Sequence, residues 1–224
     1  MSPPPPRQLV VSVVADFVCP WCYIGHVEIT RALQKVRLAP WAPSKLQLLH
    51  QPYSVYERPL KTPPKGELVI DYLADVYGVD QSFLKDPSLN ASLAAAQKAG
   101  IELSWSRRVT DSTLAHQAVL SLQQQQQITD DTEIAGIMTR IYKAYFGNAL
   151  DISDIKVLRD VVQKPLNLSP SDSVPWRSDV DGVPLVEVRA ADEGPLVELI
   201  GEDIECDKIV DEIKGLCVSS FLNA

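Results

Sequence analysis

The sequence has no surplus of basic residues: its 224 residues include 21 lysines and arginines against 29 aspartates and glutamates, a formal net charge of −8. Affinity for nucleic acid depends on clustered lysine and arginine that neutralise phosphates, so this balance argues against a nucleic-acid-binding protein. With 46% apolar residues, the chain has enough hydrophobic material for a sizeable core. The composition is that of an ordinary globular protein.

Long hydrophobic runs are also missing. No stretch approaches the ~20 apolar residues that a membrane-spanning helix needs. The start of the chain, MSPPPPRQ, has neither the basic nor the apolar region of a secretory signal. We therefore expect a cytoplasmic protein with no membrane partner, and a disordered proline-rich tail over residues 1–8.

Cysteines are scarce, and one pair has a chemically suggestive spacing. Cys19 and Cys22 form a CxxC motif, and no second CxxC, CxxH or HxxxH pair follows. Because a structural zinc ion needs four ligands, we predict no metal site. A pair of inert buried cysteines is the other alternative to thiol chemistry. Cys206 and Cys217 are eleven residues apart on a predicted helix, about 16 Å, which is too far for a disulfide.

The motif stands between a predicted strand and a predicted helix. Residues 9–18 form a nearly continuous apolar run, typical of a buried strand, and Pro20 suits the first position of a helix. Cys19 then occupies the N-cap, where unpaired backbone N–H groups stabilise a thiolate. We predict that Cys19 is an exposed attacking sulfur. Cys22, one turn later and less exposed, would resolve the mixed disulfide.

The segment from Asp16 to Gly25, DFVCPWCYIG, resembles the active-site segment of DsbA-family thioredoxin-fold oxidoreductases, especially the FrnE-like branch with its D-x-x-C-P-W-C-Y-x-G pattern. The resemblance implies an α/β thioredoxin-like fold (βαβ…ββα) with a large all-helical insertion, and it implies that Pro20 and Trp21 contact the substrate. Two roles stay open for Asp16, which precedes Cys19 by three residues. It is either a proton relay buried beneath the cysteines or a partner for the backbone of the turn.

The rest of the pattern agrees with an insertion between two halves of such a fold. Residues 46–53 read as a second strand, completing a parallel βαβ unit. Helical periodicity then appears in five segments, at 68–77, 89–99, 113–127, 132–146 and 154–163. A sixth helix, interrupted near Pro175, is predicted over 169–180. The predicted domains are a thioredoxin-like domain of residues 9–57 and 181–218 and an inserted helical domain of residues 58–180.

The chain returns to the sheet through Gly182-Val183-Pro184, which feeds a predicted strand from 185 to 188. In the family resembled, the corresponding proline has a cis peptide bond and packs against the CxxC motif. The resemblance therefore implies that Val183 and Pro184 bind the substrate. A partner strand at 196–200 and a closing helix at 204–216 complete the predicted sheet domain.

The three histidines of the sequence differ in their surroundings. His116 lies in Leu114-Ala115-His116, which resembles the L-A-H-R segment of FrnE-like proteins, with glutamine in place of the arginine. We expect His116 to line the substrate cleft, with core packing as the alternative. His26, four residues after Cys22, is expected to be a solvated polar residue, with contact to the resolving cysteine as the alternative. His50 is expected to be a satisfied core or edge residue.

One segment departs from the family pattern. Gly201-Glu202-Asp203-Ile204 stands where FrnE-like proteins usually read G-A-Q-P. Acidic residues beside the cleft disfavour an anionic thiol such as glutathione and raise the pKa of a neighbouring thiolate. No resident cofactor is predicted; glutathione stays open as a co-substrate and a homodimer as the assembly.

Three functions are compatible with the sequence. The leading hypothesis is a thiol-disulfide oxidoreductase whose thiol or disulfide substrate binds in a cleft between the two subregions. The alternative is a small-molecule isomerase or glutathione-transferase-like enzyme, because 2-hydroxychromene-2-carboxylate isomerases and kappa-class transferases share the scaffold, although they normally carry serine at the position of Cys19. The third is a non-catalytic binding module.

Overall fold

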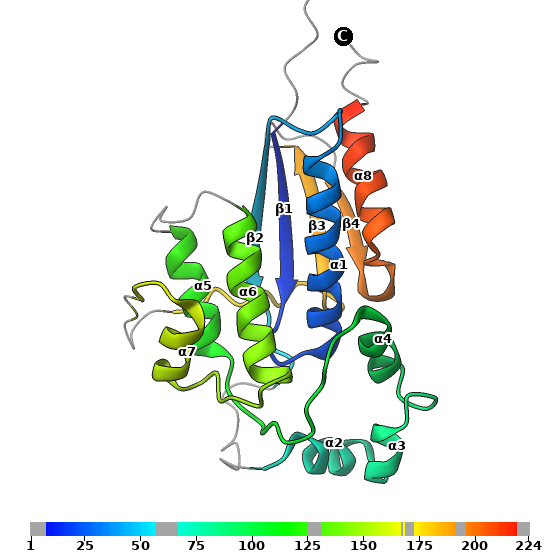
Figure 1. Ribbon diagram of the computed structural model, residues 1–224, viewed down its shortest axis with the longest axis vertical. Coiled ribbons are helices and arrows are strands. Elements are labelled where there is room, and N and C mark those ends of the chain that lie inside the picture. The colour runs from blue at the N-terminus through cyan, green and yellow to red at the C-terminus, as the bar shows by residue number, and fades with distance from the viewer. Residues whose placement is uncertain are drawn as a thin grey trace, which may run out of the picture.

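The computed structural model describes residues 8–56, 67–124, 131–166, 168, 173–190 and 196–218. Its centre is a sheet with the strand order β2-β1-β3-β4 (Figure 1). β1 (Gln8–Ala15) pairs parallel with β2 (Lys45–Pro52) and antiparallel with β3 (Leu185–Ala190), and β3 pairs antiparallel with β4 (Leu196–Ile200). Because β1 has a strand on each side, its unbroken apolar run is buried almost throughout.

Two halves of the chain build this sheet, in the predicted order. α1 (Pro20–Arg37) joins β1 to β2, and α8 (Cys206–Val218) follows β3 and β4. α1 starts beside the carboxyl end of β1, runs back along the sheet and packs against α8 (Figure 1). Its buried face repeats at helical spacing, with Ile29, Leu33 and Val36 turned toward the core.

In the described part of the chain, six helices lie between β2 and β3. They are α2 (Val69–Tyr77), α3 (Gln81–Lys85), α4 (Ala91–Ala99), α5 (Thr113–Gln124), α6 (Asp131–Phe146) and α7 (Ile155–Val162). Gly78 and Gly100 end α2 and α4 in the left-handed conformation, as helix-terminating glycines do. α3 was not predicted, because a five-residue helix is too short to show a periodic pattern.

The insertion covers the sheet in two places (Figure 1). α2, α3 and α4 lie beyond the carboxyl end of β1. α5 and α6 contact β2, α6 also lies beside α1, and α7 packs against α5 and α6. Aromatic contacts bind α6 to the active-site segment: the ring of Tyr142 stacks on Tyr23 at 5.0 Å between centroids and lies 5.0 Å from Phe17. The core of the insertion is therefore continuous with the core beneath the cysteines.

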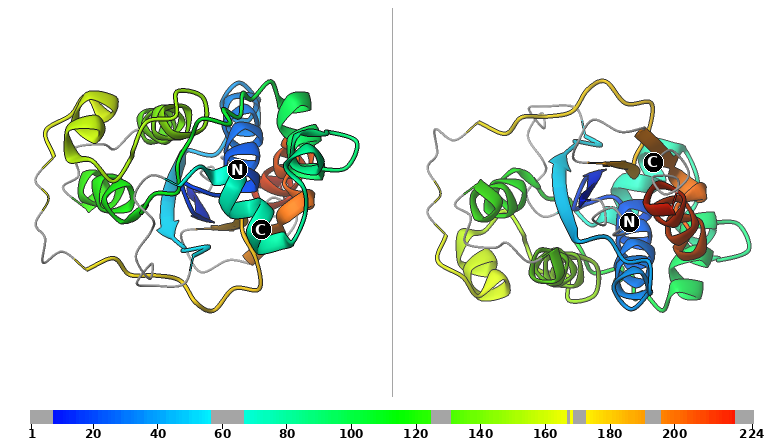
Figure 2. Two further views of the ribbon diagram at one scale, coloured as in Figure 1. Left: turned by 90° about the horizontal axis from the view of Figure 1, so that it is seen from below. Right: turned by 90° about the horizontal axis from the view of Figure 1, so that it is seen from above.

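The predicted helix over 169–180 is wrong for residues 173–180, which form an extended segment on the side of the sheet away from α1 and α6 (Figure 2). Pro175 removes one helical donor and restricts the residue before it. The N–H of Arg177 donates instead to the carbonyl of Pro52, and its guanidinium binds Glu187 of β3. Tertiary bonds to the sheet thus replace the helix.

Several other predictions fall at the limits of the described residues. Gln8, predicted to belong to the tail, is the first residue of β1, while residues 1–7 lie outside the described chain. The proline-rich residues 58–65 and the predicted boundary at residue 58 lie outside it too. Among the residues described, no helix is long and apolar enough to cross a bilayer.

Candidate active site

The two cysteines lie where the sequence places them, at the start of α1. Cys19 is the N-cap residue, with extended backbone angles (φ −88°, ψ 120°), and Pro20 begins the helix. Cys19 and Cys22 are both free thiols. Cys22 is fully buried, and Cys19 is only 7% exposed. The prediction of an exposed Cys19 is therefore wrong, because the residue packs into the same apolar cluster as Phe17 and Val18.

The surroundings shift the pKa values of the two thiols in opposite directions. A hydrogen bond with the Cys22 side chain lowers the pKa of Cys19 against the opposing effect of burial, and the N–H groups of Cys22 and Trp21 lower it further. Burial raises the pKa of Cys22 well above its usual value, and the neighbouring Cys19 sulfur adds to the rise. The pair is thus built to carry its negative charge on Cys19.

Pro184 packs against the helix just behind the motif. The Val183–Pro184 peptide bond is cis, Pro184 is buried and Val183 is half-buried. A Cβ atom at Gly25 would lie 2.9 Å from Cγ of Pro184 and 3.5 Å from Cγ2 of Ile204. Position 25 therefore has room only for a hydrogen, and the absent side chain lets the proline reach the active-site helix.

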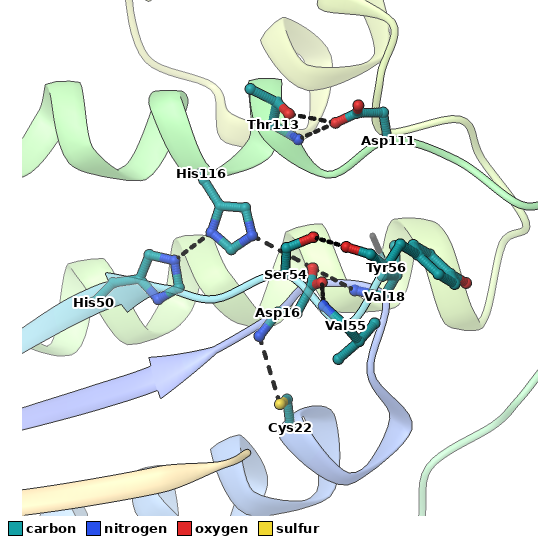
Figure 3. Close-up of polar contacts among 10 residues, drawn as sticks. All are labelled: Asp16, Val18, Cys22, His50, Ser54, Val55, Tyr56, Asp111, Thr113 and His116. Atoms are coloured by element: carbon teal, nitrogen blue, oxygen red, sulfur yellow. Dashed lines mark hydrogen bonds and ion pairs between the residues drawn. The ribbon is translucent and has the colours of Figure 1, made fainter. Parts of the chain in front are cut away.

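Asp16 is fully buried and makes several hydrogen bonds (Figure 3). The N–H of Val18 donates to its Oδ1 at 3.3 Å, and the N–H of Val55 donates to its Oδ2 at 2.8 Å. Its own backbone N–H points at Sγ of Cys22, 3.5 Å away. Burial acts to raise the pKa of Asp16, but the hydrogen bonds from His116, Val55 and Ser112 bring it below the usual value. Of the two predicted roles, bonding to the backbone is observed, and the proton relay stays a prediction.

Two of the histidine predictions are wrong. His116 has no exposed surface, so it does not line an open cleft; its Nε2 lies 3.4 Å from Oδ1 of Asp16, at the back of the site. His26 is not solvated: it is 2% exposed, its Nε2 lies 2.8 Å from Oγ1 of Thr139, and burial lowers its pKa to about 4. His50 is a core residue, as expected, and it contacts His116.

Sequence reasoning missed two contributors to the site. Val55 binds Asp16 through its backbone N–H, and no sequence pattern encodes that contact. His50 joins the site through His116, which is 66 positions away in the chain. Among the described residues, no three histidine, cysteine or acidic side chains gather into a metal-binding group.

A cavity of about 490 Å³ opens beside Trp21, between α1, α4 and the start of α8, and neither Cys19 nor Cys22 is among its lining residues. Its wall includes Trp21, Ile24 and Gly25, the charged residues Glu28, Arg31 and Lys98, and residues 204–207. Trp21 is half-buried in this wall, whereas Pro20 is half-buried outside it. The cavity therefore joins a helix of the insertion to the two helices of the sheet, and it presents charges of both signs.

The family model described as the DSBA-like thioredoxin domain matches residues 10–165. The chain belongs to this family. The match begins in β1, includes both cysteines and ends after α7, so the helical insertion is part of the DSBA-like domain. The prediction of a DsbA-family protein with an α/β thioredoxin-like fold is thereby confirmed.

Solved structures extend the likeness over nearly the whole chain. A probable DsbA oxidoreductase from Streptomyces coelicolor superposes with a TM-score of 0.61 at 14% identity, covering 93% of this chain and 90% of that one. The cytosolic disulfide reductase DsbM from Pseudomonas aeruginosa gives a TM-score of 0.54 at 15% identity, covering 96% and 100%. At these identities the likeness shows the fold. No curated protein matches the sequence.

Proposed function

We propose that this DSBA-like protein is a thiol-disulfide oxidoreductase of the FrnE-like type, with Cys19 and Cys22 as its CPWC redox pair. The observation that carries the proposal is the placement of Cys19 at the N-cap of α1, with Cys22 buried one turn behind it and Pro184 packed on the next turn. The opposite pKa shifts of the two thiols support the division of labour between them.

The reaction needs no atoms beyond the two cysteines and the substrate. The Cys19 thiolate attacks a disulfide RS–SR′, an S–S bond forms between Cys19 and R, and R′S⁻ leaves. Cys22 gives its proton to the released R′S⁻, and its sulfur attacks Sγ of Cys19, so that RS⁻ leaves and the Cys19–Cys22 disulfide forms. Two electrons have then passed from the protein to the substrate. The reverse sequence oxidises a dithiol.

The setting and the partners belong to the same proposal. The similar protein DsbM is described as cytosolic and as a disulfide reductase, and a cytosolic pair would be kept largely reduced. A thiol such as glutathione would then regenerate the pair, with the substrate disulfide held by Trp21, Val183 and Pro184. A homodimer is the assembly proposed with it.

Trapping tests the proposal directly. Cys22→Ser is expected to accumulate a mixed disulfide at Cys19 with a model disulfide, because no second sulfur remains to release it. Intact-mass and peptide mass spectrometry measure the adduct, and insulin reduction measures turnover. Cys217→Ser in α8 is the matched control and should keep full turnover. A Cys22→Ser protein that reduces insulin at the wild-type rate would refute the redox cycle.

The cavity supports a second candidate function. A volume of about 490 Å³ beside Trp21 falls in the range of small-molecule sites, which suits an isomerase or glutathione-transferase-like enzyme. Such an enzyme needs no resolving cysteine, since the isomerases and transferases on this scaffold normally carry serine at the position of Cys19. Turnover of a small aromatic substrate that survives Cys22→Ser, without insulin reduction by the wild type, would favour this alternative.

A further inference from the structure

Behind the cysteines, three buried side chains form a hydrogen-bonded row (Figure 3). Nε2 of His50 lies 2.8 Å from Nδ1 of His116, and Nε2 of His116 lies 3.4 Å from Oδ1 of Asp16. The two imidazole rings are nearly parallel, with 5.0 Å between their centroids. The residues come from β2, α5 and the position directly after β1, and none is more than 3% exposed.

The geometry determines which nitrogen donates and which accepts in the hydrogen bonds of this row. Nδ1 of His50 has no hydrogen-bond partner among the residues described. Burial, with smaller effects of His116 and His26, holds the pKa of His50 well below its usual value, so its ring is neutral and carries one N–H. A buried N–H without an acceptor is rarer in proteins than a buried acceptor without a donor. The proton of His50 therefore lies on Nε2, which donates to His116.

This assignment determines the state of the second ring. Nδ1 of His116 accepts from His50, so the proton of His116 lies on Nε2, and that N–H faces the Asp16 carboxylate. A buried carboxylate is costly unless donors surround it. The backbone supplies donors from Val18 and Val55, and His116 supplies a side-chain donor.

We propose that His50 and His116 are positioning residues that keep the Asp16 carboxylate ionised and oriented beneath the two cysteines. The inference rests on the proposed thiol-disulfide chemistry and adds a part to it. His50 acts through His116, and His116 acts through Asp16. Neither histidine makes a hydrogen bond to the reacting sulfurs among the described contacts.

The charge of Asp16 matters because it is felt at both sulfurs. The negative charge of Asp16 is one contribution that raises the pKa of each cysteine, although the hydrogen bond from Cys22 leaves the pKa of Cys19 below its usual value. An ionised Asp16 therefore holds back thiolate formation, and a less stable thiolate makes the disulfide a weaker oxidant. Through Asp16, the histidine pair would set how reducing the cysteine pair is.

Few other groups near the row can change charge between pH 5 and pH 9. Burial raises the pKa values of Tyr56 and Tyr142 and brings that of Tyr145 to about 12, so these phenols stay neutral. His26 stays neutral as well, since its pKa is about 4. Of Asp16 and the two cysteines, only Cys19 changes charge in this range, because the pKa of Asp16 is below its usual value and that of Cys22 is well above its own.

Ionisation of Cys19 in the reduced protein tests the inference, measured by thiolate absorbance at 240 nm and by the rate of iodoacetamide alkylation at pH 6. His116→Leu is expected to raise that rate roughly three- to tenfold, because Asp16 loses one of its donors and ionises less readily. His50→Leu should raise the alkylation rate as well.

Two control variants accompany these. His116→Gln should keep an alkylation rate near that of the wild type, since its amide replaces the lost N–H. His26→Leu, which also removes a buried histidine, should leave the rate unchanged. Equal rates in His116→Leu and His26→Leu would overturn the inference.

A double-mutant cycle gives a second measurement. Asp16→Asn should raise the alkylation rate as His116→Leu does, and combining the two should add nothing further. Additive effects would mean that His116 acts independently of Asp16, against the inference. If His116→Leu does not fold, His116→Asn replaces it, because asparagine is too short to reach Asp16. These readouts do not need turnover, so absence of insulin reduction in the wild type would count against the proposed function alone.

Discussion

Gly25 and Pro184, 159 positions apart in the sequence, touch at the active site, with the proline ring occupying the space that a side chain at position 25 would need. This contact fixes the Val183–Pro184 turn against the helix that carries the cysteines. It also explains why glycine follows the CPWC motif at this distance: a larger residue would separate the two halves of the site.

Gly25→Ala is therefore expected to destabilise the protein by about 1–3 kcal/mol, as overpacking does, and to lower insulin reduction because Pro184 moves away from Cys19. Gly215→Ala is the control, since a Cβ there meets nothing within 4 Å on the exposed side of α8. It should stabilise the protein by about 0.5–1 kcal/mol. Urea unfolding measures both. Equal stability changes in Gly25→Ala and Gly215→Ala would show that Pro184 can move to accommodate the added methyl group without a cost in stability.

The two thiols should differ sharply in reactivity. At pH 7 we expect iodoacetamide to label Cys19 at least about tenfold faster than Cys22, because Cys19 is the more acidic and Cys22 is fully buried. Peptide mass spectrometry after a timed quench measures the ratio, with Cys206 and Cys217 as internal references. Faster labelling of Cys22 would reverse the assignment of attacking and resolving sulfur.

Acid should weaken the fold through His26. Its pKa falls from 6.5 to about 4 on folding, so the unfolded chain binds the proton more readily. Stability is complete above pH 6.5 and is lost as the pH falls toward 4. From this residue alone we expect a loss of roughly 2 kcal/mol between pH 7 and pH 5. His26→Gln should remove that part of the loss in urea unfolding at the two pH values. An unchanged pH dependence would contradict the burial effect.

Filling the cavity should separate the two candidate functions. Ala95→Trp narrows the space between α4 and α1 without touching the cysteines. If protein disulfides are the substrates, insulin reduction should stay within about twofold of the wild type, as for other changes away from the reacting atoms. The same substitution should block a small aromatic substrate that enters the cavity. A large loss of insulin reduction would place the protein substrate in the cavity itself.

Much of the fold could be predicted because its signals are local. The apolar run of β1, Pro20 after it, and the helix-ending glycines Gly78 and Gly100 each reflect the conformation of a few consecutive residues. The segment 173–180 failed for the opposite reason: Arg177 takes its partners from strands far away in the sequence. Local preference had no means of anticipating them.

The site shows the same division. The motif identified Cys19 and Cys22, and the resemblance drew attention to Asp16 and Pro184. The burial of Cys19 and of His116 depends on contacts between segments far apart in the sequence, such as the packing of His116 on Phe17, and these arise only in the folded chain. The partnership of His50 with His116 joins two elements whose pairing no spacing in the sequence reveals.

The antiparallel bridge between Leu68 and Arg108 has a consequence for how such a protein can diversify. Backbone hydrogen bonds from Val69 to Arg107 and from Val109 to Glu67 join the two ends of the segment that contains α2, α3 and α4. A segment whose ends are paired in this way can change in length or residue type without altering the register of the strands in the sheet. Because α4 forms one side of the cavity, exchanging that stretch is a route by which evolution or an engineer could retune selectivity while the cysteines keep their setting.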